Sequence, residues 1–222
     1  MNAAHVGTAV HAFLLAFPAL FSIINPLAGA LIFHETTAVL PDEERPKVAS
    51  KVGFYSLMVM LLALWTGSYV LAFFGISLAA LRIAGGVVVA LFGWELLKAP
   101  EQWESRKRDQ ATRFVSDDLA FFPLTLPITT GPGTISVVIA LGSERPDEVG
   151  GALLFFAGAS AAAAAMAVVI ALLYRWADRF AYLLGRSGER ILTRLSALLL
   201  LCIGVQILIG GVTGMLAPLL QH

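Results

Sequence analysis

The sequence is short of charged residues. Only 14% of its 222 residues are Asp, Glu, Lys or Arg, while 58% are apolar and the mean hydropathy is +0.82. A water-soluble domain carries about 25% charged residues, so this composition excludes that class and is typical of a chain that crosses a membrane several times. The 15 basic and 15 acidic residues cancel, so net charge predicts no binding to nucleic acid. The expected environment is the lipid bilayer.

Cysteine and metal-binding patterns are equally scarce. Cys202 is the only cysteine, so it forms no disulfide within the chain, and His5 and His11 are not accompanied by other metal ligands. The sequence also lacks the spacings typical of zinc hydrolases, serine hydrolases and P-loop enzymes. We therefore expect no metal, no cofactor, no catalytic residue and no enzymatic activity.

Long apolar runs are abundant. A membrane-spanning helix needs about 20 apolar residues, and six stretches meet this requirement. The predicted spans are residues 6–34, 53–74, 76–97, 119–142, 150–173 and 195–217. The first run has no basic residue before it and is longer than a signal peptide, so we expect it to be retained as a span. We predict an all-α, polytopic membrane protein with six transmembrane helices.

Lys and Arg collect in alternate loops. Three follow the first span, five follow the third and five follow the fifth, whereas the opposite loops contain only Arg145, and Arg82 lies just inside the third span. Because cytoplasmic loops are enriched in basic residues, we predict that both termini face outward. Residues 174–186 keep most apolar side chains on one helical face, which predicts a helix lying along the cytoplasmic interface.

Proline is confined to two of the six spans. Each of these spans has a proline near its start and a second interruption eight or nine residues later. The first span has Pro18 and then Asn25-Pro26; the fourth has Pro123, Pro127 and then Gly131-Pro132. Proline removes a backbone donor and glycine adopts dihedrals that other residues avoid, so we predict that helices 1 and 4 are broken at mid-membrane. Opened backbone survives there only where protein or a wet cavity satisfies it, which makes the two breaks the candidate site.

Spans three and six share a seven-residue repeat of small residues. The repeats are Ala79, Gly86 and Gly93, and Ala197, Gly204 and Gly211. Glu95 and Gln206 each lie two residues after a glycine of these repeats, Gly93 and Gly204. Each half of the chain has three spans, an odd number, so related halves lie in opposite orientations in the membrane. We predict two inverted-topology three-helix repeats, one in residues 1–110, which include a cytoplasmic loop, and one in residues 111–222.

Four of these segments resemble the MarC family of bacterial inner-membrane proteins. They are Ile24-Asn25-Pro26-Leu27-Ala28-Gly29, Pro127-Ile128-Thr129-Thr130-Gly131-Pro132-Gly133-Thr134, Arg82-Ile83-Ala84-Gly85-Gly86 and Gly204-Val205-Gln206. The resemblance covers nearly the whole chain in order. It implies a location in the bacterial inner membrane and a fold similar to six-span amino-acid exporters. In that membrane the outward side, on which the basic loops place both termini, is the periplasmic side. Archaeal relatives are described as transporters of small neutral amino acids such as glycine and alanine.

A helix that begins at mid-membrane offers free N–H groups and the positive end of its dipole to an anion. Discontinuous helices of secondary transporters hold substrate carboxylates in this way, so the two breaks predict a site for a small zwitterion. The expected substrate-binding residues are Ser22, Asn25, Pro26, Gly29, Thr129, Thr130, Gly131, Pro132, Gly133, Thr134 and Gln206. Glu95 is the acidic residue lying inside a span and is the candidate for proton coupling.

The sequence therefore predicts a secondary transporter of a small polar solute, with small neutral amino acids as the leading class. Alternating access would occur around the two discontinuous helices. Two alternatives remain open. One is a channel that uses the breaks as a re-entrant filter. The other is a non-transporting protein whose small-residue seams pack against a partner, for which a second copy of the chain, forming a homo-oligomer, is one candidate.

Overall fold

The computed structural model describes residues 3–98, 119–143, 146 and 149–216. Within this part of the chain every regular element is a helix, which confirms the predicted all-α polytopic fold. The elements are α1 (Ala3–Ile24), α2 (Pro26–Thr37), α3 (Arg45–Phe73), α4 (Leu78–Lys98), η1 (Ala120–Thr129), α7 (Pro132–Ser143), α8 (Val149–Arg175) and α9 (Ala177–Leu216). The predicted basic loop at 99–118 and Arg145 lie outside the described residues.

Five helical segments of the described chain are long and apolar enough to cross a bilayer. The bent pair formed by η1 and α7 makes a sixth if it is taken as one span. In order, these segments match the six predicted stretches. Residues 174–186, predicted as an interfacial helix, contain the end of α8 at Arg175 and the first part of α9, which runs from Ala177 to Leu216. The part of α9 that is apolar enough to cross a bilayer begins at Ala197, so the interfacial position of 174–186 stays a prediction.

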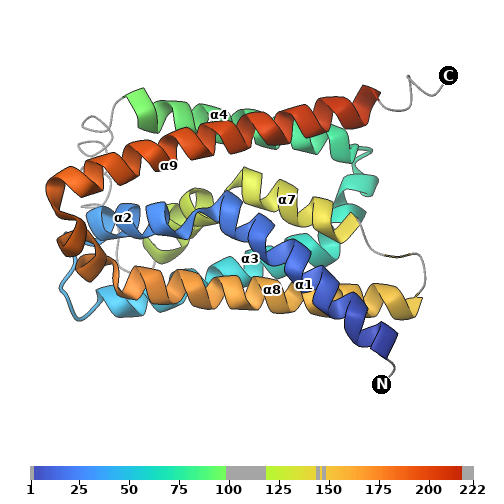
Figure 1. Ribbon diagram of the computed structural model, residues 1–222, viewed down its shortest axis with the longest axis horizontal. Coiled ribbons are helices and arrows are strands. Elements are labelled where there is room, and N and C mark those ends of the chain that lie inside the picture. Colours follow the sequence, from blue (N-terminus) through green and yellow to red (C-terminus); the bar gives the residue numbers. More distant parts are fainter. Residues whose placement is uncertain (1–2, 99–118, 144–145, 147–148, 217–222) are drawn as a thin grey trace.

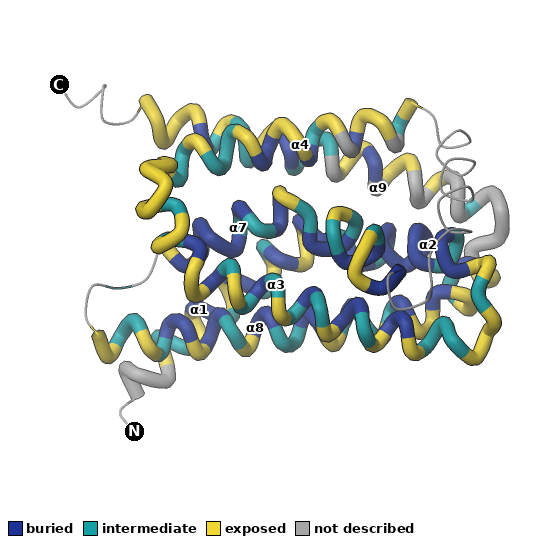
Figure 2. Tube along the Cα trace, turned by 180° about the vertical axis from the view of Figure 1, so that it is seen from behind, coloured by how far each residue is buried: buried dark blue, intermediate teal, exposed yellow. Residues whose placement is uncertain are grey.

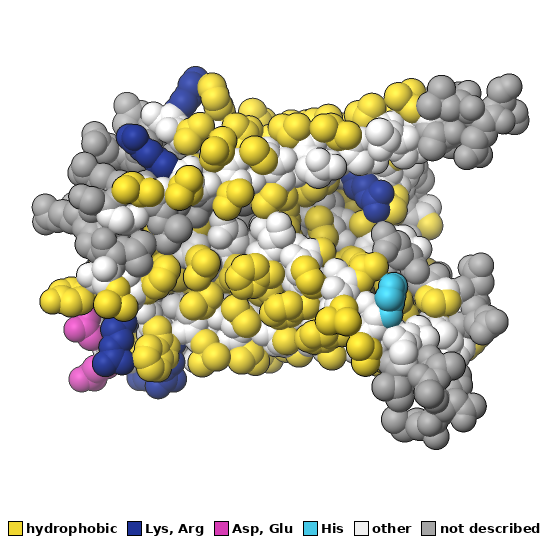
Figure 3. All heavy atoms as spheres, viewed as in Figure 1, with side chains coloured by type: hydrophobic (Ala, Val, Ile, Leu, Met, Phe, Trp, Pro, Cys, Tyr) yellow, Lys and Arg dark blue, Asp and Glu magenta, His cyan; other side chains and the backbone are white. Residues whose placement is uncertain are grey.

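The helices run back and forth along one direction, and the start of α1 and the end of α9 lie at the same end of the molecule (Figure 1). The α2–α3 loop and the turn between α8 and α9 lie at the other end, which we call the basic end because Arg45, Arg175 and Arg179 are there. Apolar side chains cover the middle of the visible surface, and the charged side chains that are drawn lie toward its ends (Figure 3). This distribution suits a protein whose middle zone faces hydrocarbon.

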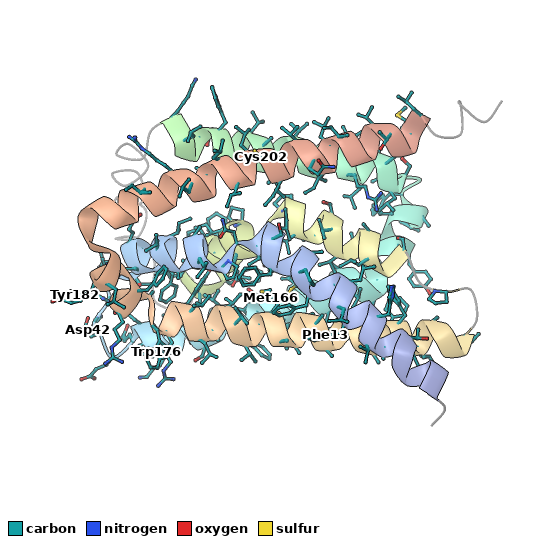
Figure 4. All side chains as sticks on the ribbon, in the orientation of Figure 1. Phe13, Asp42, Met166, Trp176, Tyr182 and Cys202 are labelled. Atoms are coloured by element: carbon teal, nitrogen blue, oxygen red, sulfur yellow. The ribbon has the colours of Figure 1, made fainter. Side chains whose placement is uncertain are left out.

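The buried core lies where α1, α2, α3, α7 and α8 meet (Figure 2). Lipid tails are as apolar as these side chains, so helices in a membrane associate through close packing rather than through exclusion from water. Small residues provide that packing on α8, where Gly158 packs against the backbone of Ala9 and Ala162 is fully buried. Met166 points from α8 into the interior (Figure 4).

Helices α4 and α9 form a pair at one side of this core (Figure 1). The two heptads of small residues face each other in this pair. A Cβ atom added at Gly86 would lie 2.7 Å from the Gly204 carbonyl oxygen, one at Gly93 would lie 2.9 Å from the Ala197 oxygen, and one at Gly211 would lie 2.9 Å from the Ala79 oxygen. In these contacts the residue numbers rise along α4 as they fall along α9, so the two helices are antiparallel. The heptads allow backbone-to-backbone packing.

Candidate functional site

The helix of the first apolar span is interrupted at Asn25. Helix α1 ends at Ile24, Asn25 adopts the left-handed conformation with φ 46° and ψ 65°, and α2 begins at Pro26. Asparagine is one of the few residues other than glycine that enters this region readily, and proline suits the first position of a helix because its missing N–H has no intrahelical partner there. The Asn25 side-chain oxygen lies 3.5 Å from the Ala28 amide nitrogen and caps α2.

The fourth apolar span is bent by 66° between η1 and α7. Within η1, Phe122 and Leu126 have extended dihedrals, and each precedes a proline, whose ring disfavours the helical conformation in the residue before it. Helix α7 then starts at Pro132, and its first amide-to-carbonyl bond runs from Ile135 to Gly131. The amides of Gly133 and Thr134 therefore lie ahead of the first intrahelical hydrogen bond.

Threonine hydroxyls satisfy the backbone that this irregular segment opens. Thr125 donates to the Ala120 carbonyl at 2.7 Å, Thr129 to the Leu124 carbonyl at 2.7 Å, and Thr130 to the Thr125 carbonyl at 3.1 Å. Serine and threonine side chains commonly replace lost backbone partners inside membranes. A hydroxyl has only one proton, so the Thr129 hydroxyl can accept a hydrogen bond from a solute but cannot donate one.

A cavity of about 190 Å³ lies between the two interruptions. It is bounded by the end of α1 and the start of α2, by the end of η1 and the start of α7, and by α4. Its lining residues are Ile23, Ile24, Asn25, Ala28, Gly29, Ile32, Val88, Val89, Pro127, Ile128, Thr129, Gly131, Pro132, Gly133 and Thr134. Most of this lining is apolar, and the polar groups are concentrated at the two interruptions.

One side chain at the cavity carries a buried polar group that forms no hydrogen bond among the described residues, namely the amide nitrogen of Asn25. Thr134, 4% exposed, also lines the cavity. Leaving a buried donor unpaired costs about 1 to 3 kcal/mol. A polar solute in the cavity would remove that cost.

The predicted site residues divide into two groups. Seven line the cavity together: Asn25, Gly29, Thr129, Gly131, Pro132, Gly133 and Thr134. The others lie elsewhere: Ser22, Gln206 and Glu95 are exposed, and Pro26 and Thr130 are buried outside the lining. Glu95 lies in the last turn of α4, which ends at Lys98. The Lys98 ammonium group lies 4.9 Å from the centre of the Trp94 ring.

Two further helices, α4 and α8, contribute residues at or behind the cavity that were not predicted from the sequence. Val88 and Val89 of α4 form one wall, and a Cβ at Gly133 would overlap the Val89 side chain. Tyr174, at the end of α8, packs its hydroxyl against Gly29 and lies 2.9 Å from the Thr129 hydroxyl. Nothing in the local sequence distinguishes these valines from other apolar residues, and Tyr174 was expected in an interfacial segment.

An ion-paired cluster lies at the basic end of the molecule. The Asp178 carboxylate accepts from His34 Nδ1 at 2.5 Å and from an Arg45 guanidinium nitrogen at 3.1 Å. Arg45 also donates to the carbonyls of Ala38 and Leu40. Partial burial alone would raise the pKa of Asp178, but the hydrogen bonds from His34 and Arg45 and the charge of Arg45 outweigh it and hold this pKa below its ordinary value.

This cluster predicts an acid-dependent contribution to stability. A carboxylate whose pKa is lowered by folding stabilises the folded state above its ordinary pKa, about 3.9, and loses that effect as the pH falls through the lower folded-state value. We expect Asp178→Asn to lower the melting temperature in detergent at pH 7 and the difference from wild type to shrink below about pH 4. Glu43→Gln is the control, because Glu43 is exposed and forms no ion pair among the described residues. A difference that grows in acid would contradict this assignment.

The comparisons with known proteins agree with one another. The sequence profile described as MarC family integral membrane protein matches residues 10–216. A UPF0056 membrane protein of Methanocaldococcus jannaschii is 32% identical over 204 residues, which are 92% of this chain and 97% of that protein. The UPF0056 inner membrane protein MarC of Salmonella paratyphi A is 32% identical over 212 residues, covering 89% of this chain and 92% of that one. No solved structure matches the chain.

Proposed function

Because the chain belongs to the MarC family of integral membrane proteins, we propose that it is a secondary transporter of a small polar solute. Small neutral amino acids are the substrate class that we favour, and transport rather than a chemical reaction is the activity. The observation that carries the proposal is the cavity between the two interruptions, to which both contribute lining residues. Discontinuous helices that meet at one cavity are a recurrent design of secondary transporters.

The size of the cavity favours a small solute. Pockets that hold drug-sized ligands are about 300 to 1,000 Å³, whereas this one is about 190 Å³. Three glycines keep its walls close to the backbone, namely Gly29, Gly131 and Gly133. A bulky drug therefore fits these dimensions poorly, and a molecule of the size of glycine or alanine fits them well.

The polar groups favour a solute with a carboxylate. The first amides of α7, the Thr134 hydroxyl and the Asn25 amide nitrogen are hydrogen-bond donors, and the N-terminus of a helix adds the positive end of its dipole. Acceptors for an ammonium group are available as well, because Thr129 lines the cavity and the Pro127 carbonyl lies beside Gly131. The inventory matches a zwitterion.

The antiparallel α4–α9 pair supports the proposed inverted repeat. Where two repeats are related by a two-fold axis in the membrane plane, corresponding helices that meet at the axis are antiparallel, and each contact between them has a symmetry-related counterpart. The contacts between the two heptads follow this pattern around Gly86 and Gly204. We propose that residues 1–110 and 111–222 are the two repeats, with both termini on the outer side because basic residues mark the inner side. Alternating access would then move one repeat relative to the other.

We expect Thr134→Val to weaken solute binding at least about tenfold while leaving the fold intact. Valine has the shape of threonine but no hydroxyl, and a hydrogen bond to a charged group contributes about 1.5 to 3 kcal/mol. The measurement is the half-saturating concentration of glycine and of alanine in counterflow with purified protein in liposomes. Thr66→Val is the matched control, because the Thr66 hydroxyl donates to the Leu62 carbonyl of its own helix outside the cavity. Equal effects of both variants would count against the site.

A further inference from the structure

Tyr174 connects the two interrupted spans. The residue is 1% exposed, its hydroxyl lies 2.9 Å from the Thr129 hydroxyl, and its ring centre lies 5.0 Å from that of Phe33. A Cβ atom at Gly29 would overlap the Tyr174 hydroxyl. Gly29 belongs to the first turn after one interruption, and Thr129 is the last residue of η1 before the other. A single side chain from α8 therefore touches both.

The hydrogen bond between Tyr174 and Thr129 has a defined direction. The Thr129 proton is donated to the Leu124 carbonyl at 2.7 Å, and a hydroxyl has no second proton. The Tyr174 hydroxyl is therefore the donor and the Thr129 oxygen the acceptor. Because Thr129 is held by its own backbone, it offers a fixed anchor for the phenol.

Tyr174 lies behind the cavity on the side of the basic end. Gly29 and Thr129 both line the cavity, and Tyr174 covers both from the last turn of α8, one residue before that helix ends. Its neighbour Phe33, 1% exposed, lies one further turn along α2 in the same direction. Both aromatic side chains are buried next to the cavity, and Phe33 lies between Gly29 and the end of α2 at Thr37.

Asp178 fixes the segment that carries Tyr174. It lies four residues later, beyond the turn at Trp176, and accepts hydrogen bonds from His34 of α2 and Arg45 of α3. Arg45 in turn binds the carbonyls of Ala38 and Leu40 in the α2–α3 connection. The nearby Asp42, Trp176 and Tyr182 lie at this same end (Figure 4). The residues from Tyr174 to Asp178, which we call the elbow, are thereby tied to the end of the first interrupted span.

We propose that the elbow is the gate of the cavity toward the basic end, with Tyr174 as the plug and the Asp178 ion pairs as the latch. The gate rests on the proposed transport function, since it is the part that opens when solute passes to that side. Opening requires the Tyr174–Thr129 hydrogen bond to break and the elbow to leave His34 and Arg45. Tyr174 is a positioning residue in the closed state, because it contacts Gly29 and Thr129, which line the cavity on the sides of the two interruptions.

The test measures access to the cavity without any solute. Cys202 is replaced by alanine, Thr134 by cysteine, and the labelling rate with a membrane-impermeant thiol reagent is measured separately from each side of oriented vesicles. We expect slow labelling from the basic side, at least tenfold faster labelling from that side when Tyr174→Ala is added, and a smaller acceleration with Asp178→Asn. Tyr174→Phe, which keeps the ring and loses the hydrogen bond, should fall between wild type and Tyr174→Ala.

The matched control is Tyr182→Ala, because Tyr182 is 87% exposed on the neighbouring turn of α9. The gate is rejected if Tyr174→Ala labels no faster than Tyr182→Ala, or if labelling accelerates equally from both sides, as general loosening would cause. Asp178→Asn removes a partly exposed carboxylate and keeps the core intact, so it decides the case if Tyr174→Ala does not fold. Faster labelling from the basic side without flux of any solute would retain the gate and reject the transport function.

Discussion

Replacing Asn25 and Pro26 together by leucine is expected to reduce solute flux to the level of empty liposomes. Asn25 is the left-handed residue that ends α1, and Pro26 starts α2. Leucine disfavours the left-handed conformation by about 1 to 2 kcal/mol and restores the missing N–H, so the span should become one continuous helix. The backbone groups at the former interruption would then form hydrogen bonds within the helix and would no longer be available to a solute in the cavity. The measurement is counterflow of glycine and alanine with purified protein.

Pro18→Leu is the control for this change. Pro18 lies inside α1, which continues through it, and its side chain is exposed. The variant removes a proline from the same span without touching the interruption or the cavity, so it should transport normally. Both variants should insert into the membrane and elute as single species. If the Asn25-Pro26 variant retains at least half of the wild-type flux, the interruption is not needed for transport.

Leucine at Gly204 is expected to lower the melting temperature in detergent by roughly 6 to 12 °C. A Cβ at this position would overlap the backbone nitrogen of Ala90 and lie 2.8 Å from the Gly86 carbonyl oxygen. Backbone atoms cannot rotate away, so α4 and α9 must separate along their seam. Overpacking of this kind costs up to about 3 kcal/mol or more, and each kcal/mol shifts the midpoint of a chain of this size by roughly 2 to 4 °C.

Gly210→Leu provides the matched comparison on the same helix. A Cβ at Gly210 meets nothing within 4 Å, so the same substitution there should change stability by less than about 0.5 kcal/mol. The two variants have identical composition and differ only in which face of α9 carries the leucine. Equal losses of melting temperature in both would show that the α4–α9 seam is not the cause.

Much of the fold could be predicted from the sequence because the signals are local. Apolar runs give the spans, and proline and glycine mark Asn25-Pro26 and Gly131-Pro132, where α2 and the η1–α7 bend occur. The heptads of small residues could be recognised in the sequence, but not that they face each other, because pairing depends on how α4 and α9 meet. Family membership, first suggested by a resemblance of short motifs, is established by matches over most of the chain.

The sequence predicted only those site residues that lie at the interruptions and are close to one another along the chain. Asn25, Gly133 and Thr134 lie at the interruptions themselves and line the cavity. Val89 and Tyr174 reach it from distant helices, and their type is ordinary for a membrane span, so no sequence signal marks them. Gln206 and Glu95, each two residues after a glycine of the heptads, were expected to take part in the site, yet both side chains are exposed, because a place in a repeat does not determine which helix face turns inward.

The central claim is that the two interruptions enclose one binding site for a small polar solute. It is tested most directly by flux through liposomes that contain only this protein, measured for zwitterions of increasing size from glycine to phenylalanine, with and without ion gradients. We predict saturable flux for the smallest members and none for those too large for a cavity of about 190 Å³. Flux indistinguishable from empty liposomes for every member, or flux independent of size, would contradict the claim.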